Sequence, residues 1–195
     1  MNKYIHFTLE VGIISDKNDL FKFKIPLFGT SNVGKTSLIL RFVNESFVND
    51  IKKTIGTNFL VKDFEMDRKN IRLLIWDIGG QAQFSNMRTV YFKGSNAAIG
   101  VFDITSSDSI LKIPKWIATI EKLGLKIPML LLGNKYDLAP NMQIVKEKEI
   151  KELISQVSKQ MGVPVEFMYT SALNGLNVEE AFSIIAKMCI ENSPK

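Results

Sequence analysis

The order of apolar and polar residues along this chain predicts that strands and helices alternate from residue 21 onward. Apolar runs predict strands at residues 21–28, 58–66, 71–77, 97–103, 129–134 and 166–170. Apolar residues at helical spacing predict helices at residues 35–44, 84–92, 111–123, 146–161 and 178–192. Such alternation is typical of stacked βαβ units around a largely parallel sheet. We therefore expect an α/β fold with three layers, a six-stranded sheet and five helices.

The second and third strands are expected to form an antiparallel hairpin, the one antiparallel part of the sheet. Only residues 67–70 separate them, and a crossover helix does not fit in so short a connection. Pro26 is unusual in a central strand because proline cannot donate a ladder hydrogen bond. Either it occupies a bulge or the predicted strand is locally wrong. At the last helix, Asn177 with Glu180 three residues later predicts a reciprocal N-terminal cap.

Residues 1–20 form an extension before the single predicted domain, which covers residues 21–195. Between residues 4 and 13 apolar side chains alternate strictly with other residues, which predicts a half-buried strand. We expect this strand to lie beside the second strand of the sheet and to cover its edge. The alternative is a frayed tail in which the alternation is accidental.

A glycine-rich loop stands between the first strand and the first helix. Its residues "GTSNVGKT" fit the pattern G-x-x-x-x-G-K-[ST], in which backbone N–H groups wrap a phosphate at a helix N-terminus, as in P-loop NTPases. Lys35 supplies positive charge to the outer phosphates, and the Thr36 hydroxyl is a ligand for Mg²⁺. Asn32 tolerates the positive φ for which many such loops use glycine. The expected nucleotide-binding residues are Gly29, Ser31, Asn32, Val33, Gly34, Lys35, Thr36 and Ser37.

The stretch "LLLGNKYDL" predicts which base is bound. Asn134, Lys135 and Asp137 follow the end of a strand, so they project into the ligand crevice of a parallel sheet. An aspartate there accepts two hydrogen bonds from the N1–H and the amino group of guanine, whereas adenine has no matching donors. We therefore expect GTP and GDP as ligands.

The stretch "IWDIGGQ" ends the third strand with further candidates. Asp77 is expected to hold a water bound to Mg²⁺, and the Gly80 N–H is placed to contact a γ-phosphate when its loop is drawn inward. The alternative is a turn whose glycines serve only its geometry.

These three motifs, in this order and spacing, resemble those of the Ras superfamily of small GTPases, and the resemblance covers residues 21–192. "TIGTNF" resembles the switch I region of Rab proteins, "YFKGSNAAIGVFDIT" resembles the following helix and strand, and "YTSAL" resembles the last guanine-contacting loop. Asn32 and "WDIGGQ" are instead similar to Arf proteins.

The resemblance implies roles for further residues. Thr54 would bind Mg²⁺ and the γ-phosphate, Phe47 would stack on guanine, and Gln81 would orient the attacking water. Beside the base would lie Ser171, Ala172 and Leu173. An aromatic trio would report the state of the switches to effectors, although a role in the core is the alternative: Phe59, Trp76 and Tyr91.

The implied reaction is slow hydrolysis of GTP, with Lys35 and Gln81 as the catalytic residues and Mg²⁺ bound. Arg41 and Arg88 look suited to packing or partner contacts, so an arginine from a separate activating protein is expected. An exchange factor and effectors are the other implied partners, and we expect a monomer.

Departures from the family pattern carry expectations of their own. Leu173 stands where the family usually has a lysine beside the base, so nucleotide is expected to dissociate faster. Ser31 replaces a glycine found in Ras, although Rab proteins tolerate serine there. Cys189 is seventh from the end and residue 2 is Asn2, so neither prenylation nor myristoylation is expected, and membrane recruitment would run through partners or the N-terminal segment.

Composition narrows the remaining classes. The net charge of +5 is scattered, so it indicates a lysine-rich surface or a polyanionic ligand and gives no support for nucleic acid. One cysteine and one histidine leave little material for a zinc site or a His-based triad. No apolar run reaches the roughly 18 residues of a membrane span, and no signal peptide is evident, so a cytoplasmic protein is expected.

Two rival functions stay open. One is a scaffold locked to GTP or GDP that hardly turns over, against which Gln81 weighs. The other is a P-loop ATPase or kinase, against which Asp137 argues.

Overall fold

Alternation of apolar residues gives the central sheet two apolar faces, and helices cover both. In the computed structural model, which describes residues 20–47, 54, 56–80 and 88–193, the strands are β1 Leu20–Phe28, β2 Thr57–Met66, β3 Lys69–Ile78, β4 Ala98–Asp103, β5 Met129–Asn134 and β6 Val165–Tyr169. They form one sheet of order β2-β3-β1-β4-β5-β6, in which only the β2–β3 pair is antiparallel. The predicted α/β fold and its mostly parallel sheet are confirmed.

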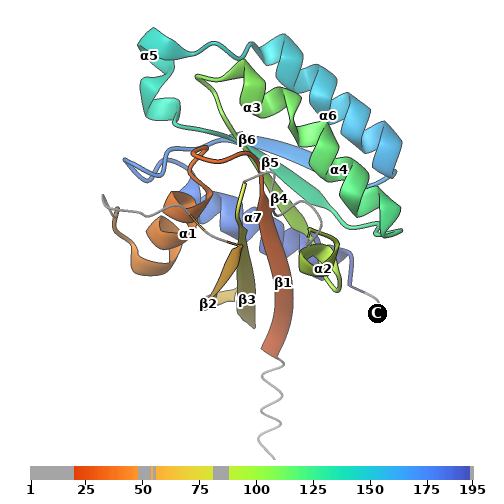
Figure 1. The fold of residues 1–195 in the computed structure, drawn as a ribbon. Coiled ribbons are helices and arrows are strands. Elements are labelled where there is room, and N and C mark those ends of the chain that lie inside the picture. The colour runs from red at the N-terminus through yellow and green to blue at the C-terminus, as the bar shows by residue number, and fades with distance from the viewer. Residues whose placement is uncertain (1–19, 48–53, 55, 81–87, 194–195) are drawn as a thin grey trace, which may run out of the picture.

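The helices form the two outer layers of the fold (Figure 1). They are α1 Lys35–Asn44, α2 Arg88–Phe92, α3 Ser107–Leu111, α4 Ile113–Lys122, α5 Ala139–Met142, α6 Glu147–Met161 and α7 Val178–Glu191, with a 3₁₀ turn, η2, at Tyr136–Leu138. On β5, Leu130 and Leu132 pack in the cluster that contains α1 and α7. Met129 and Leu131 point to the opposite face, in the cluster that contains α2, α4 and α6. Strand periodicity thus builds both cores.

The β2–β3 hairpin is tighter than expected from the sequence. Its loop is only Asp67 and Arg68, whose φ angles of 50° and 60° are both positive. Two successive positive φ angles suit the right-handed twist of two-residue hairpins. The predicted hairpin is confirmed, and β3 begins two residues earlier than predicted.

Pro26 needs neither a bulge nor a break in β1. The register with β3 is continuous through Pro26 and Trp76. On the other side of β1 the ladder with β4 begins only at Leu27 and Ile99. Pro26 therefore lies just before the second ladder starts, where its missing N–H interrupts no pairing.

Two predictions about the helices are wrong, and a third is confirmed. The helix expected at residues 111–123 is α4, with Pro114 in its first turn, and α3 is a separate short helix that ends at Leu111. The described residues also form α5 and η2, so five helices were too few. Asn177 has a left-handed φ of 55° and makes no cap. Its amide instead donates to the carbonyl of Tyr169.

Some predictions lie outside the described residues. These are the strand expected near residues 4–13 and the start of the helix expected at residues 84–92, of which the described part is α2. The additional edge strand beside β2 stays a prediction.

Candidate nucleotide-binding site

The loop from Gly29 to Gly34 turns the chain from β1 into α1, and its backbone requires unusual φ angles. These are 139° at Gly29, 66° at Asn32 and 97° at Gly34. A Cβ at Gly29 would overlap the carbonyl oxygen of Val101, so no other residue fits there. The N-cap residue of α1 is Gly34, which has no side chain to cap the first turn. The first backbone N–H groups of a helix left without such a cap suit an anion.

Lys35 is folded back onto the loop that precedes it. Its Nζ donates to the carbonyls of Gly29 at 3.1 Å and Thr30 at 2.8 Å, and the residue is only 6% exposed. Burial lowers the pKa of this ammonium to about 8, although the nearby Asp77 carboxylate raises it. The loop thus holds a cation that is poorly solvated and suited to a polyanion.

This pKa predicts that nucleotide affinity depends on pH. Below pH 8 the Lys35 amine is protonated and charged in the folded protein. Above pH 8 it loses its proton in the folded protein, whereas in an unfolded chain it stays protonated up to about pH 10.5. The ligand-free fold therefore gains stability between those values, whereas the Kd for GDP rises by up to about tenfold per pH unit. Calorimetric titration on both sides of pH 8 measures this rise. Lys35→Met is the control: it should bind GDP more weakly, and its Kd should change with pH only through the ionisation of guanine. The same dependence of Kd on pH in both proteins would contradict the prediction.

Three oxygen-bearing side chains meet beside the loop. The hydroxyls of Thr36 and Thr54 donate to Oδ2 of Asp77 at 2.5 and 2.9 Å, and the hydroxyl oxygens lie 3.0 Å apart. Asp77 is buried, and its Oδ1 has no hydrogen-bond partner among the described residues. An unpaired buried carboxylate oxygen is costly unless something positive satisfies it. Hard oxygen donors and an unsatisfied carboxylate suit Mg²⁺, so these residues fit that ion.

The end of β3 lies against the same loop. A Cβ at Gly80 would overlap the backbone of Thr30 and Ser31, so glycine allows this close approach. The N–H of Gly79 donates to the carbonyl of Gly56 at 2.8 Å, which ties the start of β2 to the end of β3. Gln81 lies outside the described residues, and its role in catalysis stays a prediction.

Asn134, at the end of β5, joins the loop to the other candidate segments. Its Nδ2 donates to the carbonyl of Val33 at 2.8 Å, and its Oδ1 accepts from the hydroxyl of Thr170 and the N–H of Ala172, each at 3.3 Å. Asn134 is 2% exposed. One buried amide therefore fixes three segments that are distant in the sequence.

Asp137 and Ser171 form the next contact along this edge of the sheet. The Ser171 hydroxyl donates to Oδ1 of Asp137 at 2.5 Å, and Ser171 itself is buried. A carboxylate accepts several hydrogen bonds, so Asp137 keeps capacity for further donors. The structure thus places the predicted base-selecting carboxylate and the 171–172 segment together.

Comparison with known proteins decides the family. The family model described as "Ras family" matches residues 24–191. The chain belongs to the Ras family of small GTPases. Curated relatives are of the Rab and Ypt type, which agrees with the Rab-like resemblance. Rab-13 of Canis lupus familiaris is 39% identical over 85% of this chain and 78% of its own length. YPT1 of Saccharomyces cerevisiae, a GTP-binding protein, is 35% identical over 88% and 81%.

In this Ras-family chain the aromatic trio divides between core and surface. Phe59 is 59% exposed and stacks on the partly buried Trp76, with ring centroids 5.8 Å apart. Tyr91 is buried. Burial therefore favours the core alternative for Tyr91, and a role of the trio in reporting the state of the switches stays a prediction.

Phe47 and Leu173, both predicted to contact the base, differ in burial. Phe47 is partly buried against the cluster that contains α1 and α7. Leu173 is 54% exposed. Ser37, which follows the Mg²⁺ candidate Thr36, is half-buried on α1. Leu173 lies in the same loop as Ser171 and Ala172. Within the described residues, no hydrogen bond or ring contact joins Phe47 to that loop.

Sequence reasoning missed Asp103 as a member of the site. It ends β4, in register with Asn134 at the end of β5, and its Oδ2 lies 2.6 Å from Nζ of Lys135. The available signal was positional, since the carboxyl ends of parallel strands meet at one edge. A cavity of about 630 Å³ adjoins this pair. Residues 30–33 and residues from α3 and α4 also line it.

The described ranges of the chain also bear on metal binding and on membrane spanning. No cluster of three or more His, Cys, Asp or Glu side chains suits a metal ion there. No helix in those ranges is long and apolar enough to cross a bilayer.

Proposed function

We propose that this protein is a GTP/GDP switch that hydrolyses GTP slowly and acts in Rab-like trafficking or signalling. The observation that carries the proposal is the hydrogen bond from the Asn134 amide to the Val33 carbonyl. It fixes the phosphate-binding loop relative to the segment that carries Asp137. A ligand that fills both ends must combine a polyphosphate with a base that has two adjacent donors, as guanine does.

Hydrolysis of this kind needs positioning and charge more than acid or base chemistry. Lys35 and the backbone N–H groups of the loop would stabilise charge on the phosphates, and Gln81 would orient the attacking water. Thr36 and Thr54 would hold Mg²⁺ directly and Asp77 through a water. When bound, this ion would supply positive charge that offsets the charge of the phosphates.

No arginine of the chain is proposed as a catalytic cation. The Arg41 guanidinium lies against the 174–175 loop, where Nη2 is 3.5 Å from the carbonyl of Asn174. This contact supports its assignment to packing. A separate activating protein that supplies an arginine therefore belongs to the proposal, as do an exchange factor and effectors.

The switch would work through Thr54 and Gly80. Thr54 contacts Thr36 and Asp77 through its hydroxyl, and the Gly79–Gly56 hydrogen bond links the two regions that hold Thr54 and Gly80. A γ-phosphate contacted by both would hold both regions inward, and its loss would release them. Effectors would bind one of the two states preferentially, through contacts with Phe59 and Trp76.

A cytoplasmic monomer that reaches membranes through partners completes the proposal. Cys189 is buried on α7, and burial raises the pKa of its thiol to about 12. A thiol that is buried and protonated is a poor acceptor for a lipid.

The test measures the affinities for GTP and ATP first and the rate of GTP hydrolysis second. The full chain, purified and freed of nucleotide, is expected to bind GTP at least about 100-fold more tightly than ATP. With Mg²⁺ it should release phosphate more slowly than about 1 s⁻¹. Equal affinity for ATP would overturn the guanine assignment. Tight GTP binding with no phosphate released over hours would favour the locked scaffold.

A further inference from the structure

Asp103 and Lys135 form an ion pair that joins two strand ends. Asp103 closes β4, and Lys135 follows the last residue of β5 with a left-handed φ of 67°. The carboxylate Oδ2 and the ammonium are 2.6 Å apart, and their side chains are 10% and 35% exposed. A pair this sheltered is screened less by water and salt than a surface pair.

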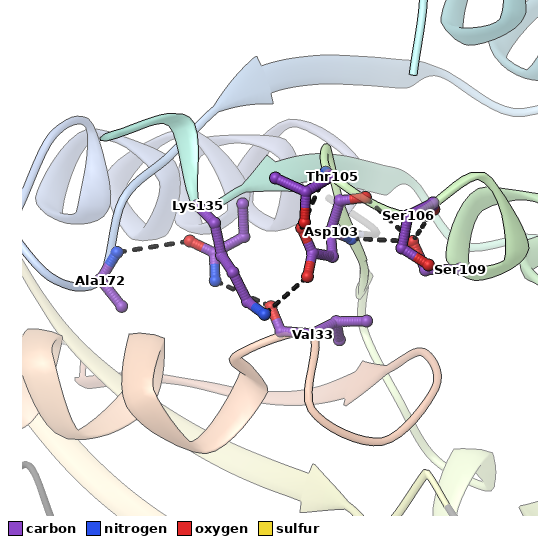
Figure 2. A network of polar contacts seen from close by, with 8 residues as sticks. Val33, Asp103, Thr105, Ser106, Ser109, Lys135 and Ala172 are labelled. Carbon is purple, nitrogen blue, oxygen red and sulfur yellow. Dashed lines mark hydrogen bonds and ion pairs between the residues drawn. The ribbon is translucent and has the colours of Figure 1, made fainter. Parts of the chain in front are cut away.

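The carboxylate is itself held rigidly (Figure 2). Its other oxygen, Oδ1, accepts from the N–H and the hydroxyl of Thr105 at 2.8 and 2.7 Å. The Asp103 N–H donates to the Ser109 hydroxyl at 3.0 Å, and that hydroxyl donates in turn to the Ser106 carbonyl at 2.6 Å. Burial alone would raise the pKa of Asp103, but the bonds from Lys135 and Thr105 outweigh it and lower the pKa. Asp103 is therefore a fixed anion.

A rigidly held carboxylate restricts the conformation of Lys135. A left-handed backbone is unfavourable for a lysine, and its long side chain has many rotamers. Lys135 stands between Asn134 and Asp137, the residues proposed to define the base site. The same stretch is tied down at Tyr136, whose N–H donates to the carbonyl of Thr170 at 3.0 Å. An anion that selects one conformer of Lys135 thus orders the segment in which Asp137 lies.

We propose that Asp103 is a positioning residue for nucleotide retention: its ion pair with Lys135 holds the 134–137 segment in the conformation that binds guanine and so slows the release of nucleotide. This inference rests on the proposed function, because it assigns a role within the same site. Asp103 does not touch the base or the phosphates in this role. It acts through Lys135.

The test is the release rate of a fluorescent GDP analogue from the full chain with Mg²⁺ present. Asp103→Asn keeps the shape of the side chain and removes its charge, and it is expected to speed release about fivefold to twentyfold. Asp63→Asn is the matched control, since Asp63 forms an ion pair of the same 2.6 Å length with Arg72 on the exposed β2–β3 hairpin. That variant should release the analogue within about twofold of the unaltered protein.

A double-mutant cycle separates positioning from a merely structural role. In a Lys135→Met background, Asp103→Asn should no longer change the release rate, because its partner is absent. A structural role through Thr105 and Ser109 would leave the Asp103→Asn effect intact in that background and would overturn the proposal. Release within twofold of the unaltered protein for Asp103→Asn itself would also overturn it.

The remaining outcomes are equally decisive. Should Asp103→Asn fail to fold, Lys135→Gln tests the pair from its more exposed side, and release faster by a similar factor is expected; an unchanged rate overturns the proposal. Failure of the unaltered protein to hold the GDP analogue would overturn the proposed function and this inference with it. A protein that holds the analogue tightly while Asp103→Asn has no effect refutes only the inference.

Discussion

Asp137→Ala is expected to weaken GTP binding by about 100- to 1,000-fold and to leave the weak binding of ATP almost unchanged. The carboxylate would accept two charge-assisted hydrogen bonds from guanine, together worth about 3–4 kcal/mol at the lower end of their usual range. ATP loses nothing, because adenine has no donors that match. The ratio of the two Kd values, from fluorescence titration with Mg²⁺ present, measures this directly.

The local structure makes this variant a clean experiment. Among the described residues the Asp137 carboxylate bonds only the Ser171 hydroxyl, and Asp137 lies in the short η2 turn, so its loss should leave the sheet intact. Asp63→Ala is a matched control, since it removes an exposed carboxylate paired with Arg72 on the β2–β3 hairpin. A variant at Asp137 that still prefers GTP to ATP by the original factor would show that another group selects the base.

Asn134→Ala is expected to damage both stability and nucleotide binding. The substitution leaves the Val33 carbonyl and the Ala172 N–H without their buried partner and opens a void beside Gly34. Such losses cost about 2–4 kcal/mol, or a fall in Tm of about 5–12 °C for a chain of this size. Thermal unfolding followed by circular dichroism measures the change without nucleotide.

Added GDP distinguishes the two effects. Because ligand stabilisation grows with [L]/Kd, the rise in Tm at a fixed GDP concentration should be smaller for Asn134→Ala than for the unaltered protein. Asn141→Ala on the exposed surface of α5 is the control and should match the unaltered protein in both measurements. An equal rise in Tm for Asn134→Ala would show that the amide serves the fold alone.

Local chemistry made much of the fold predictable. β5 has the predicted limits, and α1 begins and ends where the spacing of its apolar residues indicated. The errors occurred where a tertiary or steric requirement overrode a local pattern. The Asn177 amide, for example, bonded the Tyr169 carbonyl in place of a helix cap.

The sequence by itself determined the phosphate-binding loop, the β2–β3 hairpin and the family, because each depends on residues that are close together in the chain or on motifs in a fixed order. Only the tertiary structure decided that Asn134 holds Val33, 101 residues away, and that Asp103 pairs with Lys135. Those contacts depend on the register of parallel strands, which aligns Asp103 with Asn134. No local pattern encodes such alignment, since it follows from how the packed helices and the sheet bring the strand ends together.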